Sequence, residues 1–256
     1  MRGITDEIRA AFRGLIHAPL FTFVAVAFLA LGIGANSAIF SLIDQVILKS
    51  LPVERPGELI QVYQSGGHYG NNQGLRMNSY PMYVEFRDQS PIHVGMICRR
   101  EIGVSVAFEG NTERTIGELI SGNYFDVLGV KAHMGRLIGP DDDVKKGGHP
   151  VVVLGYDCWK TRFASDPAIV GKQLLINSFR MTVIGVSAQE FFGLDPTRAT
   201  PIRVPVTMRA EMSAGQDDRE NRRSRWVQFF ARLKPGVSVV QAKAQMQSQF
   251  RTKREM

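Results

Sequence analysis

The five histidines are the first candidates for metal binding or acid–base chemistry in this chain of 256 residues. They are His17, His68, His93, His133 and His149. None of them belongs to an HExxH pattern, in which two histidines one helical turn apart hold zinc beside a catalytic glutamate. We therefore interpret each histidine as a surface or loop residue and predict no metal site.

Other patterns that carry chemistry are missing or incomplete. The acidic run Asp141–Asp143 offers carboxylates to a hard cation, but it lacks the alternating ligands and the closing glutamate of an EF-hand loop. We expect a solvated acidic loop there. The sequence contains no GxxxxGK[ST] phosphate-binding loop and no GxSxG nucleophile elbow. We predict no catalytic residue and no cofactor, and we interpret the protein as a non-enzyme.

The sequence has two cysteines, Cys98 and Cys158, and does not decide whether they form a disulfide. An oxidising compartment permits the bond, but sequence alone does not show whether the two Cα atoms approach within about 7 Å. Cys158 lies in an apolar helical pattern with Trp159 and Phe163, which is typical of a buried free thiol.

The sequence contains one long apolar stretch, Leu20–Ile43, which has no charged residue, histidine or proline. As a helix its 24 residues span about 36 Å, enough to cross a hydrocarbon core of about 30 Å. A cleaved signal peptide has a shorter apolar core of about 7–15 residues. A buried helix of a soluble protein usually carries a polar stripe. We therefore predict a transmembrane helix within residues 19–48.

Flanking charges indicate the orientation of this helix. Arg2, Arg9 and Arg13 precede it, whereas only Lys49 and Arg55 follow closely. Because positive charges are retained on the cytoplasmic side, we expect a single-pass inner-membrane protein with a cytoplasmic N-terminus. The main domain is then periplasmic.

Residues 1–18 show apolar positions at helical spacing. This pattern predicts a cytoplasmic amphipathic helix on the membrane surface, and an ordinary solvated start to the chain is the alternative. The apolar positions are Ile4, Ile8, Phe12, Leu15 and Ile16.

Three small residues, Ala30, Gly34 and Ala38, recur at every fourth position of the apolar stretch. Such a stripe lets a second membrane helix approach closely, although small residues are also common in membrane helices by chance. Asn36 and Ser37 add groups that can form hydrogen bonds across such an interface. We predict helix packing at these three small residues, with membrane lipid around the remaining faces.

A net charge of +7 is concentrated near the end of the chain, at Arg219, Arg222, Arg223 and Arg225. Acidic residues interrupt this cluster, and a domain outside the cytoplasm does not meet nucleic acid, so we expect no nucleic-acid partner. A solvated basic loop is the interpretation that we favour, and contact with anionic lipid or an acidic partner is the alternative.

Strand and helix patterns are mixed after the apolar stretch without a strict βα alternation. This predicts an α+β domain over residues 49–256, with small mixed sheets, helices on one face and room for two subdomains. The expected strands are 59–63, 103–108, 113–120, 151–154, 173–176, 180–186 and 227–233, and the expected helices are 79–89, 123–128, 157–164 and one that begins after Ser238.

Four segments together resemble one protein family. They read ALGIGANSAIFSLIDQVILKSL from Ala30, NYFDVLGVKAHMG from Asn123, VVVLGYDCWKTRFASDPAIVG from Val151 and ARLKPGVSVVQAKA from Ala231. In this order they resemble MacB-like ABC-transporter permeases, of the orphan type that lacks a fused ATPase.

The resemblance implies a cytoplasmic helix, a membrane helix, a large periplasmic core domain and then three more membrane helices. It also implies other permease subunits or copies as partners, driven by a separate ABC ATPase. Such permeases transmit force to the periplasm and do not form a channel. Because no second apolar span occurs before Met256, a stand-alone tethered binding or scaffold module and a truncated permease fragment are the alternatives.

Overall fold

The computed structural model describes residue 13 and residues 15–43, 51–67, 69–213 and 215–254. The chain divides into two compact units, Met1–Ser50 and Leu51–Met256, each of which is described by itself. The predicted amphipathic helix of residues 1–18 lies almost entirely outside the described residues. Residues 44–48 of the predicted membrane segment lie outside them as well.

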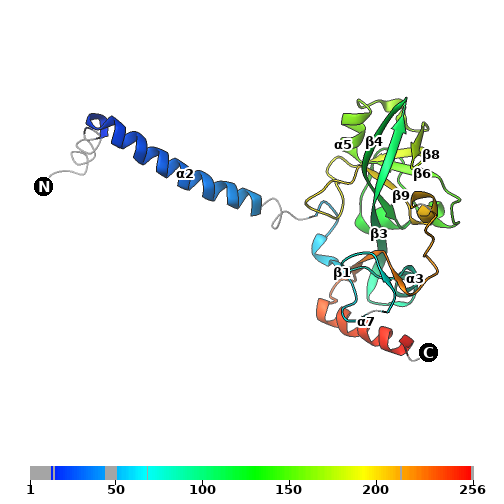
Figure 1. The fold of residues 1–256 in the computed structure, drawn as a ribbon. Helices are drawn as coiled ribbons and strands as arrows, with labels where there is room; N and C mark the ends of the chain where they lie inside the picture. The colour runs from blue at the N-terminus through cyan, green and yellow to red at the C-terminus, as the bar shows by residue number, and fades with distance from the viewer. Residues whose placement is uncertain (1–12, 14, 44–50, 68, 214, 255–256) are drawn as a thin grey trace. The chain divides into compact units, whose positions relative to one another are not determined.

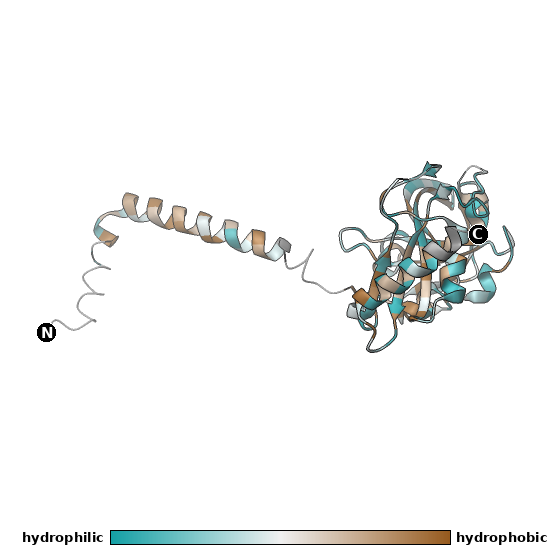
Figure 2. Ribbon diagram, turned by 90° about the horizontal axis from the view of Figure 1, so that it is seen from below, coloured by the Kyte–Doolittle hydropathy of each residue, from teal (hydrophilic) through white to brown (hydrophobic). Residues whose placement is uncertain are grey.

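The first unit contains one long helix, α2 (Pro19–Ile43). Proline begins it because the first turn of a helix needs no N–H donor from that residue. Apolar side chains are exposed along α2, among them Leu20, Phe23 and Phe28 at 77%, 73% and 72%. In Figure 2 the ribbon of α2 is coloured mostly as hydrophobic. Residues Pro19–Ser41 have a mean hydropathy of 2.1 and are long and apolar enough to cross a membrane. By length and composition, α2 is therefore a candidate membrane span.

The second unit is α+β, as predicted, but its strands join into a larger sheet than we expected. The path of the main sheet is β1-β11-β3-β4-β9-β6-β8-β5, and β7 pairs with both β3 and β8. The strands are β1 (Leu59–Val62), β3 (His93–Phe108), β4 (Asn111–Ile120), β5 (Ala132–Gly135), β6 (Val151–Leu154), β7 (Gln173–Ile176), β8 (Phe179–Ser187), β9 (Ile202–Pro205) and β11 (Gln228–Leu233), beside the short pair β2 (Asn71–Asn72) and β10 (Ser224–Arg225).

The pairings close six of these strands into a ring. Going round it, β3 pairs with β4, β4 with β9, β9 with β6, β6 with β8, β8 with β7, and β7 with β3 again. The 16-residue strand β3 also pairs with β11 through its first half, so it links the ring to the β1–β11 end of the unit. In Figure 1, β4, β6 and β8 gather at one end and β1, α3 and α7 at the other.

Among the described residues, five α-helices cover this unit, and most of them were predicted. They are α3 (Tyr80–Gln89), α4 (Tyr124–Leu128), α5 (Tyr156–Arg162), α6 (Arg209–Met212) and α7 (Val239–Arg254). Ser238 begins α7 with a capping box, because its hydroxyl accepts the Gln241 N–H at 3.2 Å and the Gln241 side chain accepts the Ser238 N–H at 2.9 Å. The Val239 side chain, which follows this cap, is 60% exposed.

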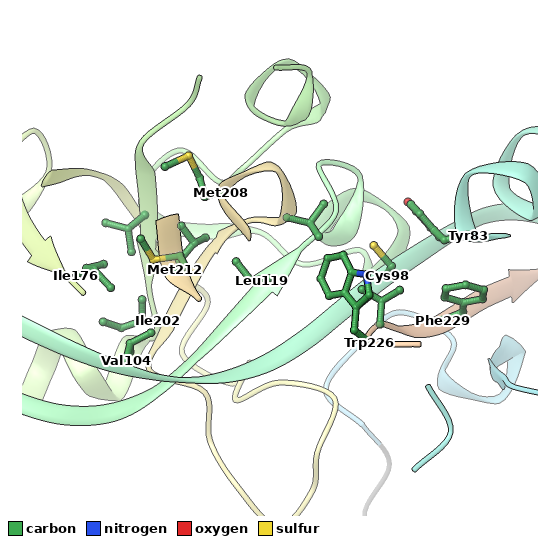
Figure 3. Close-up of a cluster of buried hydrophobic side chains, with 14 of the residues drawn as sticks. Tyr83, Cys98, Val104, Leu119, Ile176, Ile202, Met208, Met212, Trp226 and Phe229 are labelled. Carbon is green, nitrogen blue, oxygen red and sulfur yellow. The ribbon is translucent and has the colours of Figure 1, made fainter. Parts of the chain in front are cut away.

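A continuous apolar core fills the ring and continues toward α3. Val104, Leu119, Ile176 and Ile202 lie in the ring part, and Trp226 lies toward Tyr83 and Phe229 (Figure 3). A second cluster forms around α4, with Tyr124, Phe125 and Leu128. These two clusters fix the strands and loops that carry the polar groups described below.

The turns of this unit fit their local sequence. The β7–β8 hairpin turns at Asn177 and Ser178, whose φ angles are +48° and +71°. These positive values fit the two-residue turn that matches strand twist. Gly129 ends α4 with a φ of +73°, which a residue with a side chain rarely adopts.

Candidate functional site: the membrane-proximal junction

The predicted packing residues Ala30, Gly34 and Ala38 all lie on α2 and are exposed. A Cβ atom added at Gly34 meets no atom within 4 Å, and the same holds at Gly32. Gly32 lies about 200° round the helix from Gly34, on the other side from the small-residue stripe. The stripe is thus open to a partner helix, and packing there stays a prediction.

Directly after the undescribed residues 44–50, the chain is fastened to the core domain by Arg232 of β11. Its Nε donates to the Val127 carbonyl at 2.7 Å and its Nη1 donates to the Arg55 carbonyl at 3.1 Å. The Arg232 side chain is only 4% exposed. One buried guanidinium therefore joins the entering segment to the C-terminal end of α4. We name residues 51–58 with Arg232 and the end of α4 the junction.

Backbone contacts complete the junction. The Glu54 N–H donates to the Leu128 carbonyl at 2.9 Å. A Cβ atom at Gly129 would lie 2.4 Å from the Glu54 Cγ, so only glycine allows this approach. Leu51 and Val53 pack against the apolar cluster around α4. The entering segment is thus held by packing and by hydrogen bonds.

Charges at the junction are arranged around Arg232. Glu58 lies 3.8 Å from Arg232 and 3.5 Å from Arg55. Burial, with Arg55 nearby, lowers the pKa of Arg232 from its usual value. A guanidinium nevertheless keeps its charge in proteins, so the donors of Arg232 stay available at any physiological pH. No sequence pattern singles out Arg232, although it lies in the segment ARLKPG that begins at Ala231.

A second polar group lies buried between β3, β4 and β9. Glu118 Oε1 forms an ion pair with Arg99 Nε at 2.9 Å, and Glu118 Oε2 accepts a hydrogen bond from Arg203 Nε at 3.2 Å. The side chains of Glu118 and Arg203 are fully buried. Arg203 also donates to the Phe192 carbonyl at 3.1 Å and stacks 4.6 Å from the Phe191 ring centroid. We name Arg99, Glu118 and Arg203 the ion triad.

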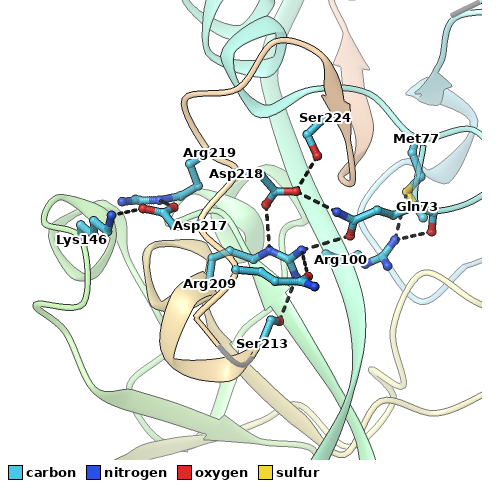
Figure 4. Close-up of polar contacts among 11 residues, drawn as sticks. Gln73, Met77, Arg100, Lys146, Arg209, Ser213, Asp217, Asp218, Arg219 and Ser224 are labelled. Atoms are coloured by element: carbon cyan, nitrogen blue, oxygen red, sulfur yellow. Dashed lines mark hydrogen bonds and ion pairs between the residues drawn. The ribbon is translucent and has the colours of Figure 1, made fainter. Parts of the chain in front are cut away.

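The basic segment near the end of the chain is only partly the solvated loop that we expected, because Arg222 and Arg223 are exposed whereas Arg219 and Arg225 are partly buried. Asp218 accepts from Arg209 Nε at 3.2 Å and from Gln73 Nε2 at 2.8 Å (Figure 4). The remaining partners in this segment are Asp217 for Arg219, Glu85 for Arg222 and Gln64 for Arg225. The contacts with Glu85, Gln64 and Gln73 depend on side chains far away in the sequence, which charge clustering alone does not reveal.

Other candidates from the sequence are structural. Asp142 is buried and accepts from Arg136 at 2.5 and 2.9 Å, so the acidic run is not the solvated loop that we expected. Hydrogen bonds from Arg136 lower the pKa of Asp142. His93 is 7% exposed and its Nε2 lies 3.0 Å from the Phe86 carbonyl, so our interpretation of it as a surface residue is wrong.

The two cysteines and the possible metal-binding side chains are candidates for reactive or metal-binding arrangements among the described residues. Cys98 and Cys158 are both free, and burial raises the pKa of Cys158 to about 11, which disfavours the reactive thiolate. Among the residues that the structure describes, no group of three histidine, cysteine or acidic side chains is placed to hold a metal ion.

Comparison with known proteins agrees with this architecture. The family model of the MacB-like periplasmic core domain matches residues 22–249. The periplasmic region of MacB from Actinobacillus actinomycetemcomitans is 19% identical and has a TM-score of 0.55, with 72% of this chain and 81% of that chain covered. The extracellular domain of the noncanonic ABC-type transporter YknZ from Gram-positive bacteria is 13% identical and has a TM-score of 0.52, with 73% of this chain and 88% of that chain covered.

No curated protein matches the chain at a significant level. The two solved structures show the shared fold, and the second is described as a domain of an ABC-type transporter. The family model covers nearly the whole chain, from α2 to α7. This chain therefore belongs to the family of MacB-like periplasmic core domains.

Proposed function

We propose that the chain is the membrane-anchored periplasmic part of an ABC-transporter permease and couples movement of α2 to the core domain. In this proposal α2 spans the inner membrane, with the N-terminus in the cytoplasm and Leu51–Met256 in the periplasm. The partners are other permease subunits or copies, and a separate ABC ATPase supplies the energy for export or other work outside the cytoplasm.

The junction is the observation that carries this proposal. A tether needs no ordered connection to the domain that it anchors. Here the entering segment is held by Arg232, by the Glu54–Leu128 backbone bond and by packing of Leu51 and Val53. A segment held in this way transmits displacement, because packed interiors deform little under load.

Replacing Gly34 with leucine tests whether α2 works with partner helices. A leucine at Gly34 fills the small-residue stripe and separates the backbones that must meet there. We expect the full chain carrying Gly34→Leu to co-purify with markedly fewer permease subunits and less ATPase from detergent-solubilised membranes of its native cell.

The matched control is Gly32→Leu, which adds the same side chain on the other side of α2 and should leave recovery unchanged. Equal recovery of wild type and both variants would favour a tethered scaffold module. Equal loss in both variants would indicate a general defect in membrane insertion.

Arg232→Met tests the junction itself. Methionine keeps most of the packing but removes both charge-assisted hydrogen bonds, each worth about 1.5–3 kcal/mol. We expect the Glu54 amide, which is hydrogen-bonded in the wild type, to exchange with solvent at least about tenfold faster, which equals about 1.4 kcal/mol of local opening. Hydrogen exchange with mass spectrometry measures this.

Lys234→Met is the control, because Lys234 lies just after β11 with an exposed side chain. Unchanged exchange at Glu54 in Arg232→Met would show that the junction does not depend on this guanidinium. In the copurified complex, Arg232→Met should also bring the ATPase activity close to that of the ATPase alone.

A further inference from the structure

Strand β3 has an open stretch of edge in the middle of the sheet. On one side it pairs with β4 from Arg99 to Phe108. On its other side, pairing with β11 ends at Arg99 and pairing with β7 begins only at Val106. Between these two partners the edge of β3 has no neighbouring strand among the described residues.

The direction of the backbone groups in this stretch follows from the β3–β4 turn. Phe108 and Asn111 flank a two-residue turn at Glu109 and Gly110, which have φ angles of +49° and +83°. The flanking pair of such a turn is hydrogen-bonded, so every second residue back from Phe108 bonds to β4. Residues at the odd positions, which include Gly103, therefore point their N–H and C=O to the open edge.

Contacts of Ser105 confirm this alternation. Its N–H donates to Asn177 Oδ1 at 2.8 Å and its carbonyl accepts from the Asn177 N–H at 2.9 Å. Asn177 thus satisfies both backbone groups of Ser105, as a residue of a neighbouring strand would. The N–H and C=O of Gly103, two residues earlier, have no partner in the described part of the chain, and Gly103 is exposed.

A surface groove of about 600 Å³ lies over this edge. Gly103, Arg114, Phe179 and Met212 are among its lining residues. A Cβ atom at Gly103 would meet nothing within 4 Å, so a second backbone can come close. Natural proteins usually cover or charge such edges, because they are templates for another strand.

We propose that the β3 edge at Gly103 binds an extended acidic peptide segment of a partner protein by β-strand addition. Arg114 sets the charge preference, because it is exposed and has no ion-pair partner among the described residues. Glu211 also lines the groove, and its Oε2 is buried. Phe179, 44% exposed, offers an apolar contact for the alternate side chains. This inference goes beyond the proposed coupling function and does not depend on movement of α2.

The test uses the full chain in lipid nanodiscs and the fluorescent probe peptide acetyl-Val-Glu-Val-Glu-Val-amide. We expect saturable binding, and slower amide exchange at Gly103 when the peptide is bound. A fully N-methylated peptide of the same sequence keeps the side chains but lacks backbone donors, and it should bind at least about tenfold more weakly. Absence of binding by the unmodified peptide, or equal binding by both peptides, would overturn the proposal.

Two pairs of variants locate the site. Gly103→Pro removes the free N–H without touching the β3–β4 ladder and should weaken binding at least about tenfold, whereas Gly103→Ala keeps the N–H and should bind normally. Thermal unfolding verifies that both variants fold, and normal binding by Gly103→Pro would contradict the site.

The second pair concerns charge. Arg114→Glu should weaken binding of the acidic peptide and favour the lysine counterpart acetyl-Val-Lys-Val-Lys-Val-amide. Lys131→Glu reverses a charge at an exposed residue outside the groove and should leave the binding of both peptides unchanged. Preference of the wild type for the lysine peptide would refute the assigned role of Arg114.

Discussion

Replacing Glu118 with leucine lowers the free energy of unfolding by about 3–5 kcal/mol. The carboxylate of Glu118 is fully buried and is shared by Arg99 and Arg203. Without it, the buried guanidinium of Arg203 loses its counter-charge and that of Arg99 keeps only Glu101, 3.9 Å away, and neither can return to water without opening β3 or β9. Denaturant unfolding of the full chain in detergent, followed by near-ultraviolet circular dichroism, measures the loss.

The matched control is Glu113→Leu on the same strand. Glu113 pairs with Arg162 at 3.0 Å, but its side chain is 65% exposed, so the expected change is within about 1 kcal/mol. A triple variant, Arg99→Met with Glu118→Leu and Arg203→Met, should recover most of the lost stability because no buried charge remains unpaired. A loss in Glu118→Leu no greater than in Glu113→Leu would show that the ion triad is not buried as described.

Trp226→Ala is expected to cost about 3–5 kcal/mol as well, for a different reason. The Trp226 side chain is fully buried and stacks on Tyr80 with ring centroids 6.0 Å apart. The guanidinium of Arg209 lies 4.5 Å from the centre of the indole ring. Removal of the ring therefore leaves a cavity. It also removes the stacking contact of Arg209, whose guanidinium forms an ion pair with Asp218.

Trp226→Phe separates these two effects. Among the described residues the indole Nε1 has no hydrogen-bond partner, so phenylalanine loses packing volume but no bond. We expect a smaller loss of about 1–2 kcal/mol, with exchange at the Gln73 amide unchanged. In Trp226→Ala the backbone N–H of Gln73, which donates to the Arg225 carbonyl at 2.9 Å, should exchange faster. Equal stability of the two variants would contradict a closely packed indole.

Features that depend on neighbouring residues were predictable from sequence. The Asn177-Ser178 turn, the glycine at the end of α4 and the Ser238 cap follow from backbone preferences within four or five residues. The apolar stretch of α2 follows from composition. The family resemblance rests on segments spread along the whole chain, and the matching family model confirms it.

Features that depend on distant partners were not predictable in this way. The middle of β3 carries Arg99, Arg100 and Glu101, and these charges argue against a buried strand until Glu118 is placed beside Arg99. Arg232 reads as an exposed strand residue until the carbonyls of Arg55 and Val127 lie within reach. The open edge at Gly103 exists only because β11 and β7 end on either side of it.

Protease treatment of spheroplasts tests the anchored, outward-facing core domain most directly. The full chain carries an N-terminal tag, protease is added to intact spheroplasts, and membranes are then washed at alkaline pH. The proposed topology predicts that the core domain is digested while a short tagged fragment containing α2 stays protected in the membrane pellet. Undigested full-length chain in the soluble fraction would contradict it.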